Sequence, residues 1–465
     1  MQKMFTKLFG SVLMISLLAG VSANAQTTTA PANLTFANAD VKADKKTDAA
    51  VTADSKSEKK DDPADSTWKP QRRLWGYTFG DFYYAGHTPG ATSSLGKENN
   101  YNGVPTGRNA FQFRRLYLGY DYDITKKFKA EVLLASEPNA NTAAIGTSGV
   151  QGGDNLADNR MGFYIKNFNL RVRDLWTGTD LVIGEMSTPG FALNEAGTNA
   201  PTSLSEATWS YRSIERTITD FHKNNSYDVG AALQGTFDPK TKNFGYVLMV
   251  GNNSTSSLLS AANANTGFYK IFYGDLWGKF MNQHLYIDIY SDYAKTAGNS
   301  AAGVTPVLGL QEHNMFKGFV SYTTPMVTFG VEAYTQKLAN GVTNKTVTPN
   351  AGEDATVNAI SVWVRGQITK NKLGYFARYD SYNPDTKLSA SSAYAVNTNY
   401  GSYDPTVKQN FVTFGLDYTP AKNIHFMPNV WFDQYKNQLD PTTSGYLPDN
   451  HTIIYRMTFF FTFGK

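Results

Sequence analysis

The stretch that decides the fold is the run HTIIYRMTFFFTFGK at residues 451–465. Every second side chain in it is apolar: Ile453, Tyr455, Met457, Phe459, Phe461 and Phe463. This alternation is typical of a β-strand with one face against an apolar medium. The mean hydropathy of the chain is only −0.38, so the rest of the sequence does not explain such a run by general hydrophobicity. We therefore expect something apolar outside the chain to face it.

The composition favours β-structure along the whole chain of 465 residues. It contains 29 Phe, 28 Tyr and 39 Gly, whereas charged residues make up only 18%. Aromatic residues suit strands and glycines suit the turns between them. The chain has no cysteine, which excludes disulfides, thiolate metal sites and a lipidated cysteine. The net charge of +4 is not gathered in basic blocks, so no nucleic-acid partner is expected.

Residues 1–25 carry the pattern of a secretory signal peptide. Lys3 and Lys7 are followed by an apolar run and then by Ala23-Asn24-Ala25, which predicts cleavage after Ala25. The apolar run is shorter than the ~20 residues that a membrane-spanning helix needs. No later stretch is long and apolar enough to span as a helix, so any membrane crossing is expected to use strands.

Residues 26–70 differ in composition from the rest of the chain. They are poor in aromatic residues and rich in Ala, Thr, Asp and Lys. Such a segment buries too little apolar surface to offset the entropy lost on ordering, so we predict a disordered periplasmic tether. Residues 71–465 are predicted to form a single domain.

That domain repeats one unit seven times: an alternating strand, a short polar turn, a second alternating strand and a longer polar loop. The segment FRRLYLGYDYDITKKFKAEVLLAS at residues 113–136 is one example. With LWGYTFGDFYY at residues 74–84 and the terminal run, these hairpins give about 16 strands of the ten-residue length that a tilted spanning strand requires.

A closed barrel accounts for these features together. Inside a bilayer every backbone polar group must be paired within the protein, which a closed barrel achieves and an open sheet does not. The prediction is an all-β fold, a transmembrane antiparallel β-barrel of about 16 strands in contact with membrane lipid. Residues 451–465 are its closing strand, with Arg456, Thr458 and Thr462 directed inward.

The same alternation assigns charged and polar residues of the other strands to the inner wall. They are Arg115, Lys129, Glu131, Arg171, Arg173, Asp228, Gln234, Asp288, Lys317, Glu332, Arg365, Arg378 and Asp417. A wall of this kind predicts an aqueous channel. Arginine binds phosphate and carboxylate bidentately, so the wall could favour anions. Equally, these arginines and acids could simply pair with one another, and the sequence leaves both interpretations open.

The segment at about residues 187–225 is longer and more charged than the other loops. It includes Trp209, Arg212, Glu215, Arg216 and His222. We expect this loop to fold into the lumen and narrow it; a cover over the outer mouth is the alternative. No catalytic motif, cofactor site or metal site is predicted, because the Asn- and Asp-rich loops lack the ordered ligand spacing of calcium sites.

Several segments resemble the phosphate-selective porin O and P family of Gram-negative bacteria. They are FRRLYLGYDY (113–122), VIGEMSTPGF (182–191) and WSYRSIERTITDF (209–221). The resemblance covers residues 72 to the end and implies a sixteen-stranded, usually trimeric outer-membrane barrel whose third loop forms a constriction and whose inner arginines guide anions. Arg115, Glu215 and Arg216 match the family pattern. Glu185 and Ser187 stand where the family commonly has an uncharged amide and a lysine, which removes cationic charge there.

The leading hypothesis is therefore a passive outer-membrane porin, assembled as a homotrimer, for small hydrophilic solutes and preferentially for anions such as phosphate. The predicted constriction residues are Arg212, Glu215 and Arg216. The predicted pore-lining residues are Arg115, Lys129, Arg171, Arg173, Arg365, Arg378 and Arg456. One alternative is a non-conducting barrel that acts as an adhesin or structural protein. A second is an outer-membrane hydrolase, although the six His residues are dispersed and no GxSxG or HExxH motif occurs.

Overall fold

The computed structural model describes residues 68–89, 101, 104–136, 163–190, 217–222, 226–252, 269–296, 311–344, 351–387, 394–396, 407–437 and 448–464. All of these belong to one compact unit, Ser66–Lys465. The predicted signal peptide and nearly all of the predicted tether lie outside the described residues.

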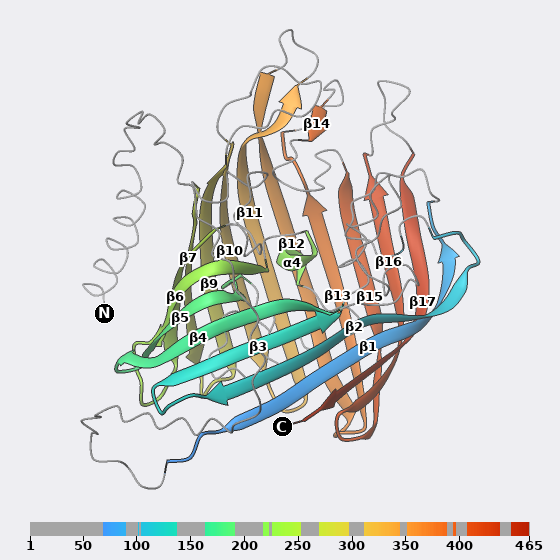
Figure 1. Cartoon of the computed structure of the whole chain (residues 1–465). Coiled ribbons are helices and arrows are strands. Elements are labelled where there is room, and N and C mark those ends of the chain that lie inside the picture. The colour runs from blue at the N-terminus through green and yellow to red at the C-terminus, as the bar shows by residue number, and fades with distance from the viewer. Residues whose placement is uncertain are drawn as a thin grey trace, which may run out of the picture. The chain divides into compact units, whose positions relative to one another are not determined.

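The described residues form seventeen strands and one short helix (Figure 1). The first nine strands are β1 (Arg72–His87), β2 (Asn109–Asp123), β3 (Phe128–Ser136), β4 (Tyr164–Trp176), β5 (Thr179–Ser187), β6 (Tyr227–Thr236), β7 (Phe244–Gly251), β8 (Ile271–Phe280) and β9 (Leu285–Thr296). The others are β10 (Gln311–Thr323), β11 (Val327–Asn344), β12 (Ala351–Thr369), β13 (Leu373–Asn383), β14 (Tyr394–Val396), β15 (Lys408–Ala421), β16 (Ile424–Lys436) and β17 (Asn450–Phe463). The helix α4 (Ile218–Phe221) lies between β5 and β6.

Sixteen of these strands close into an antiparallel barrel. Each pairs with its neighbours in the chain, except that β13 pairs with β15 and β1 pairs with both β2 and β17. The remaining strand, β14, is three residues long and pairs with Val342–Asn344 of β11. The predicted fold class is confirmed, and so are the seven hairpins, whose short turns all lie at one end of the barrel (Figure 1).

The closing strand β17 has the predicted orientation. Tyr455 and Met457 are 51% and 42% exposed on the outer face, whereas Arg456 and Thr458 are buried on the inner face. The outer faces of the other strands are likewise apolar and exposed, as at Phe111, which is 82% exposed. A continuous apolar outer face of this kind is suited to lipid. Among the described residues, no helix is long and apolar enough to cross a membrane.

Glycines and aromatic rings are paired across the strands of the inner wall. Trp75, Trp277 and Trp363 lie in register opposite Gly119, Gly245 and Gly330 on the adjacent strands. A Cβ atom at any of these three glycines would lie 2.1–2.2 Å from the indole ring, so only glycine leaves room for it. In these pairs the ring packs over a strand glycine that has no side chain of its own.

The inner wall is also more apolar than the pattern of charged residues alone predicted. One buried cluster combines inward-facing rings of β1, β2, β8, β10, β12, β13, β15, β16 and β17. Its members include Trp75, Tyr77, Phe79, Tyr83, Tyr117, Trp277, Phe319, Trp363, Phe376, Phe411, Trp431 and Phe460. Sequence reasoning missed this cluster because it followed only the polar positions of the inward phase.

Candidate functional site: the lumen and its short-turn mouth

The charged residues predicted to line the lumen lie on the inward faces of their strands, and several form ion pairs there. Arg171 on β4 contacts Glu131 on β3 (Nε to Oε1, 3.3 Å) and Asp180 on β5 (Nη1 to Oδ2, 3.2 Å). Lys129 lies 2.8 Å from Glu131 Oε1 and 3.4 Å from Asp121 Oδ2. Arginines and acids therefore compensate one another along this part of the wall.

Pairing extends to the other side of the barrel. The Arg378 guanidinium donates to Asp380 on the same inward face of β13, with Nε 2.8 Å from Oδ1. Arg456 donates from Nε to Asn429 Oδ1 over 2.9 Å, and its Cζ lies 4.6 Å from the centre of the Trp431 ring. Arg173 forms an ion pair with Asp123 close to the short turns, and Arg365 lies on the inward face of β12.

A β-bulge brings an additional arginine into the lumen. The register between β1 and β2 shifts at Phe79/Gly80, so that Arg114 and Arg115 are both buried although they are consecutive. Arg114 pairs with Asp81, Nε to Oδ2 2.7 Å. The sequence analysis did not include Arg114 among the inward residues, because a bulge depends on how two strands pair and leaves no signal in one strand's periodicity.

Two cationic side chains converge on the hydroxyl of Tyr117. Arg115 donates from Nη1 to Tyr117 Oη over 2.8 Å, and the Lys166 ammonium of β4 donates to the same oxygen over 3.4 Å. The Lys166 Nζ also lies 5.2 Å from the centre of the Tyr117 ring and 5.0 Å from that of Tyr227. The Arg115 guanidinium and the Lys166 ammonium therefore share one phenol acceptor on the inner wall.

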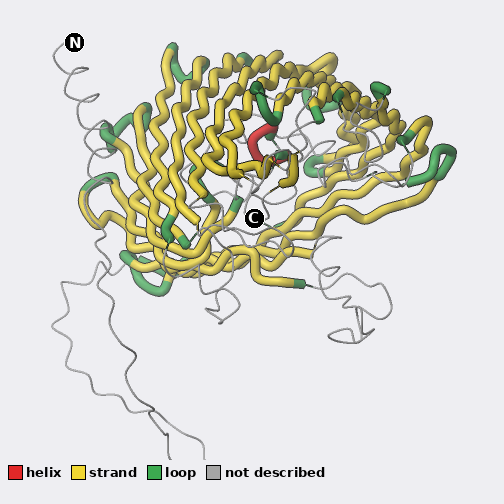
Figure 2. Tube along the Cα trace, turned by 90° about the horizontal axis from the view of Figure 1, so that it is seen from above, coloured by secondary structure: helices red, strands yellow, loops and turns green. Residues whose placement is uncertain are grey.

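The helix α4 lies inside the ring of strands (Figure 2). Its N-cap residue Thr217 accepts a hydrogen bond from the Asp220 backbone N–H through its side chain, and Ile218 is fully buried in a cluster with Val182, Met186 and other inner-wall residues. Thr219 donates from its backbone N to Glu332 Oε1 of β11 over 3.3 Å, and its hydroxyl donates to the same oxygen. A segment that follows β5 is thus attached to β11, across the barrel.

Further contacts hold this segment in the lumen. The Lys317 ammonium of β10 donates to the carbonyl of Gly190, just after β5, over 3.5 Å. The His222 ring stacks on Tyr382 of β13 with 3.4 Å between centroids. Burial among these groups and the positive charge of Arg378 lower the pKa of His222 well below its ordinary value of 6.5, so its imidazole is neutral at pH 7. The predicted constriction residues Arg212, Glu215 and Arg216 lie outside the described residues.

The first long loop also contributes to the lumen through Tyr101, which sequence reasoning did not single out. Its hydroxyl accepts from Gln112 Nε2 over 3.0 Å and from Arg456 Nη1 over 3.5 Å. Its ring packs against Tyr83 and Trp431. Burial raises the pKa of Tyr101 to about 12, so it remains an uncharged phenol.

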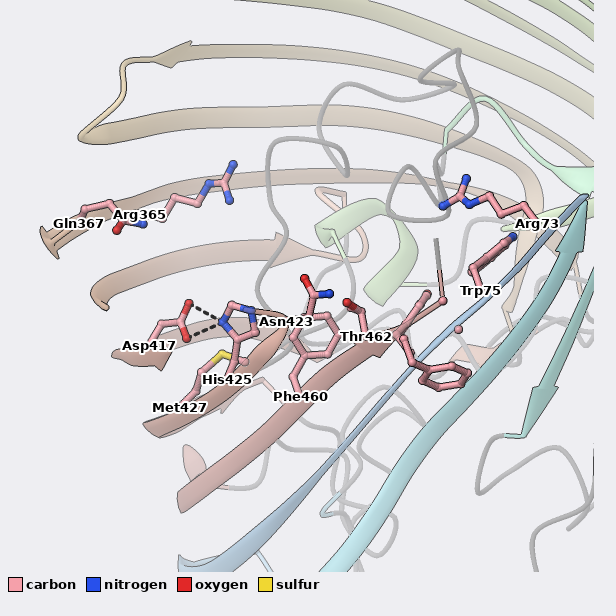
Figure 3. A pocket seen from close by; sticks show the side chains of 14 residues that line it. Arg73, Trp75, Arg365, Gln367, Asp417, Asn423, His425, Met427, Phe460 and Thr462 are labelled. Atoms are coloured by element: carbon pink, nitrogen blue, oxygen red, sulfur yellow. Dashed lines mark hydrogen bonds and ion pairs between the residues drawn. The ribbon is translucent and has the colours of Figure 1, made fainter. Parts of the chain in front are cut away.

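A cavity of about 390 Å³ lies on the inner wall at the short-turn mouth (Figure 3). Arg73 and Arg365 lie at opposite sides of its lining, and Trp75, Met427 and Phe460 supply apolar surface between them. Amide and hydroxyl groups complete the lining, from Gln367, Asn423 and Thr462.

The cavity also contains a hydrogen-bonded acid and imidazole. Asp417 lies with Oδ1 2.9 Å and Oδ2 3.2 Å from Nδ1 of His425. Thr419 contacts that same Nδ1 at 3.3 Å. Because both partners use one ring nitrogen, the imidazole cannot relay a proton from this hydroxyl to the carboxylate through its two nitrogens, which disfavours a catalytic triad here.

No family model matches the sequence, and no curated protein matches it. Solved structures do match the fold. OmpT, an outer membrane protein of Vibrio cholerae in its trimer form, aligns with a TM-score of 0.50 and 10% identity over 85% of this chain and 99% of its own. The outer membrane channel DcaP of Acinetobacter baumannii aligns with a TM-score of 0.50 and 11% identity over 85% and 97%. The chain therefore has the fold of outer-membrane β-barrel proteins, channels among them.

Proposed function

We propose that this protein is an outer-membrane porin through which small hydrophilic solutes diffuse passively, with a preference for anions such as phosphate. The observation that carries the proposal is the charged inner wall of a closed barrel. Ionised groups placed in a dry interior cost several kcal/mol each unless they are fully compensated, whereas a water-filled lumen solvates them. Ion pairs such as Arg171 with Glu131 lie on the wall, and a barrel of sixteen strands is expected to enclose more space than its side chains fill.

The anion preference is supported by the place where Arg115 and Lys166 converge on Tyr117. Inner cations such as Arg171, Arg378 and Arg114 have carboxylate partners, so selectivity is expected to be modest. The resemblance to phosphate-selective porins is consistent with this preference, and Arg115 belongs to the matching residues.

Selection by size is assigned to the segment that carries α4. Because Thr219 and His222 contact the far wall, the segment reduces the open cross-section. Arg212, Glu215 and Arg216 immediately precede Thr217 in sequence, so we propose them as the charged residues of the constriction. We also propose a homotrimer, tested by cross-linking and by native mass spectrometry.

Planar-bilayer recording tests the function directly. Purified protein under a KCl gradient is expected to give an open conductance with a reversal potential that favours chloride, and added phosphate is expected to reduce the current. Absence of any conductance would overturn the porin and leave the non-conducting barrel.

Variants test the anion preference separately. The double variant Arg115→Gln, Lys166→Gln is expected to lose about 0.5 kcal/mol of attraction for anions in the channel. This loss corresponds to a ~2-fold fall in the chloride-to-potassium permeability ratio. Arg173→Gln is the matched control, because Arg173 is paired with Asp123 at the mouth. Equal ratios in the double variant and the control would refute this assignment.

A further inference from the structure

The cavity at the short-turn mouth has a fixed position in the channel. Arg73 and Trp75 lie at the start of β1, His425 at the start of β16 and Thr462 at the end of β17. Short turns of outer-membrane barrels face the periplasm. All the lining residues come from β1, β12, β15, β16 and β17 except Asn423 in the turn before β16 and Gly464 just after β17, so rigid strands hold nearly all of them.

Arg73 gives this cavity an accessible cation. Its side chain is 29% exposed, and its only ion pair among the described residues is a 3.9 Å contact with Asp121, too long for a hydrogen bond. The Cζ atom lies 5.8 Å from the centre of the Trp75 ring. The charge of Asp417 is directed to His425, and Arg365 adds a second guanidinium on the far side. The cavity therefore favours an anionic group, which a guanidinium binds through paired N–H donors.

The remaining lining suits a small ring that carries hydroxyl groups. Trp75 follows Arg73 by two residues on the same inward face, so an anionic group on Arg73 places the adjoining atoms of a solute beside the indole. Phe460 supplies a second ring, while Gln367 and Asn423 offer amides to hydroxyls. A volume of about 390 Å³ lies at the small end of ligand pockets.

We infer that this cavity is a weak binding site for acidic monosaccharides, meaning pyranose-sized sugars that carry a carboxylate or phosphate. The inference rests on the proposed porin function and names the solute class of one place in the channel. A simple inorganic anion would use the arginines alone, and a neutral sugar would use the rings and amides alone. Only an acidic sugar uses both sets of groups, which gives it the longest residence at this mouth.

Current block in the planar bilayer tests the inference, with solutes added to the short-turn side. Glucuronate carries both features, acetate carries the charge alone and glucose carries the ring alone. Glucuronate is expected to reduce the open-channel current at a roughly tenfold lower concentration than either of the others, which corresponds to about 1.4 kcal/mol of combined contacts.

Variants identify the groups responsible. In Arg73→Gln, the glucuronate concentration needed to block the current is expected to rise to that of glucose. In Phe460→Leu, it is expected to rise toward that of acetate. Arg72→Gln is the matched control, because Arg72 is the neighbouring arginine on the outward face of β1 and lies outside the cavity lining. Open channels that glucuronate blocks no better than acetate, or an Arg73→Gln channel that behaves like Arg72→Gln, would overturn this binding site and leave the porin intact. A protein without conductance would instead overturn the porin.

Discussion

Three tryptophans of the inner wall each lie over a glycine of the neighbouring strand. Glycine in a strand normally costs stability, because it has no side chain to pack and more backbone entropy to lose. Here the indole covers the glycine backbone, so the two residues act as one packing unit. The sequence does not show which glycine faces which ring, because that depends on strand register.

Replacing Gly330 by alanine tests this packing. A Cβ at Gly330 would lie 2.2 Å from the Trp363 ring, so the ring or the strand must shift, at a cost of about 1–3 kcal/mol. The expected result is a lower urea midpoint for unfolding from lipid vesicles. Gly318→Ala on β10 is the matched control, since a Cβ there meets no atom within 4 Å. Equal midpoints for the two variants would contradict the packing argument.

Protonation of His222 is expected to make the attachment of the α4 segment to the barrel wall depend on pH. Its pKa is lowered in the folded protein, so the folded state binds fewer protons than the unfolded state at mildly acidic pH. The stability that its neutral form contributes is complete above pH 6.5 and is lost as the pH falls below that value.

Conductance recorded between pH 8 and pH 5 measures this effect. Wild-type channels are expected to become noisier or more conductive below pH 6.5, as the stacked contact with Tyr382 weakens. His222→Gln, which does not titrate, is expected to give traces that change less over the same range. Indistinguishable pH profiles would remove His222 from the attachment.

Single-residue reasoning from the sequence was reliable where a strand is regular. Arg171, Arg378 and Arg456 all lie on the predicted inward face. It did not identify Arg114, because the bulge opposite Phe79 adds a residue to one strand only. It was incomplete for Tyr101, whose place in the lumen depends on contacts with Arg456 and Trp431, far away in sequence.

At the scale of elements, the segment carrying α4 joins opposite walls of the barrel. A helix of four residues has little stability of its own, so tertiary contacts must hold it. The contacts found are the Thr219 hydrogen bonds to Glu332, the burial of Ile218 and the stacking of His222. This arrangement makes the width of the lumen depend on a few polar groups of the far wall.

Glu332→Gln tests that dependence. The substitution keeps the shape of the side chain but replaces a charged acceptor by a neutral one, which weakens the bonds from Thr219 by about 1 kcal/mol or more. The expected result is larger or more variable single-channel conductance. Thr413→Val, which removes another inner-wall hydrogen bond without touching α4, is the control. Unchanged conductance in Glu332→Gln alone would show that this contact does not position the segment.

Elements differed in how well the sequence predicted them. The hairpins followed from a period of two, short turns and aromatic strands, all of which are local signals. The three-residue strand β14 and the helix α4 were not predicted, because their hydrogen bonds and packing come from β11 and the distant wall. The cavity at the mouth likewise combines residues from both ends of the chain.

At the scale of the whole molecule, the barrel closes only through the pairing of its first and last strands. β17 bonds to β16 on one side and to β1 on the other, from Gly76 opposite Phe463 to His87 opposite Ile453. Without β17, strands β1 and β16 would each present an unpaired edge to lipid, where unpaired backbone groups cost several kcal/mol each.

Deletion of residues 450–465 is therefore expected to prevent formation of the folded barrel. The test is electrophoresis with and without heating, in which a closed barrel migrates differently before and after denaturation, combined with protease protection in vesicles. Deletion of residues 26–65 is the control and is expected to leave the barrel intact, since residues 66–465 form a compact unit. A protease-protected, heat-modifiable barrel that forms without residues 450–465 would refute the requirement for pairing between β1 and β17.

The pairing of β1 with β17 also decides which chains can form the closed barrel. Because β1 pairs with β17, no product that lacks β17 can reach the closed state, however well its hairpins form. A chain cut short before β17 would retain open edges that proteases and chaperones can recognise. The pairing that runs from Gly76 opposite Phe463 thus makes insertion of a closed barrel conditional on the presence of β17.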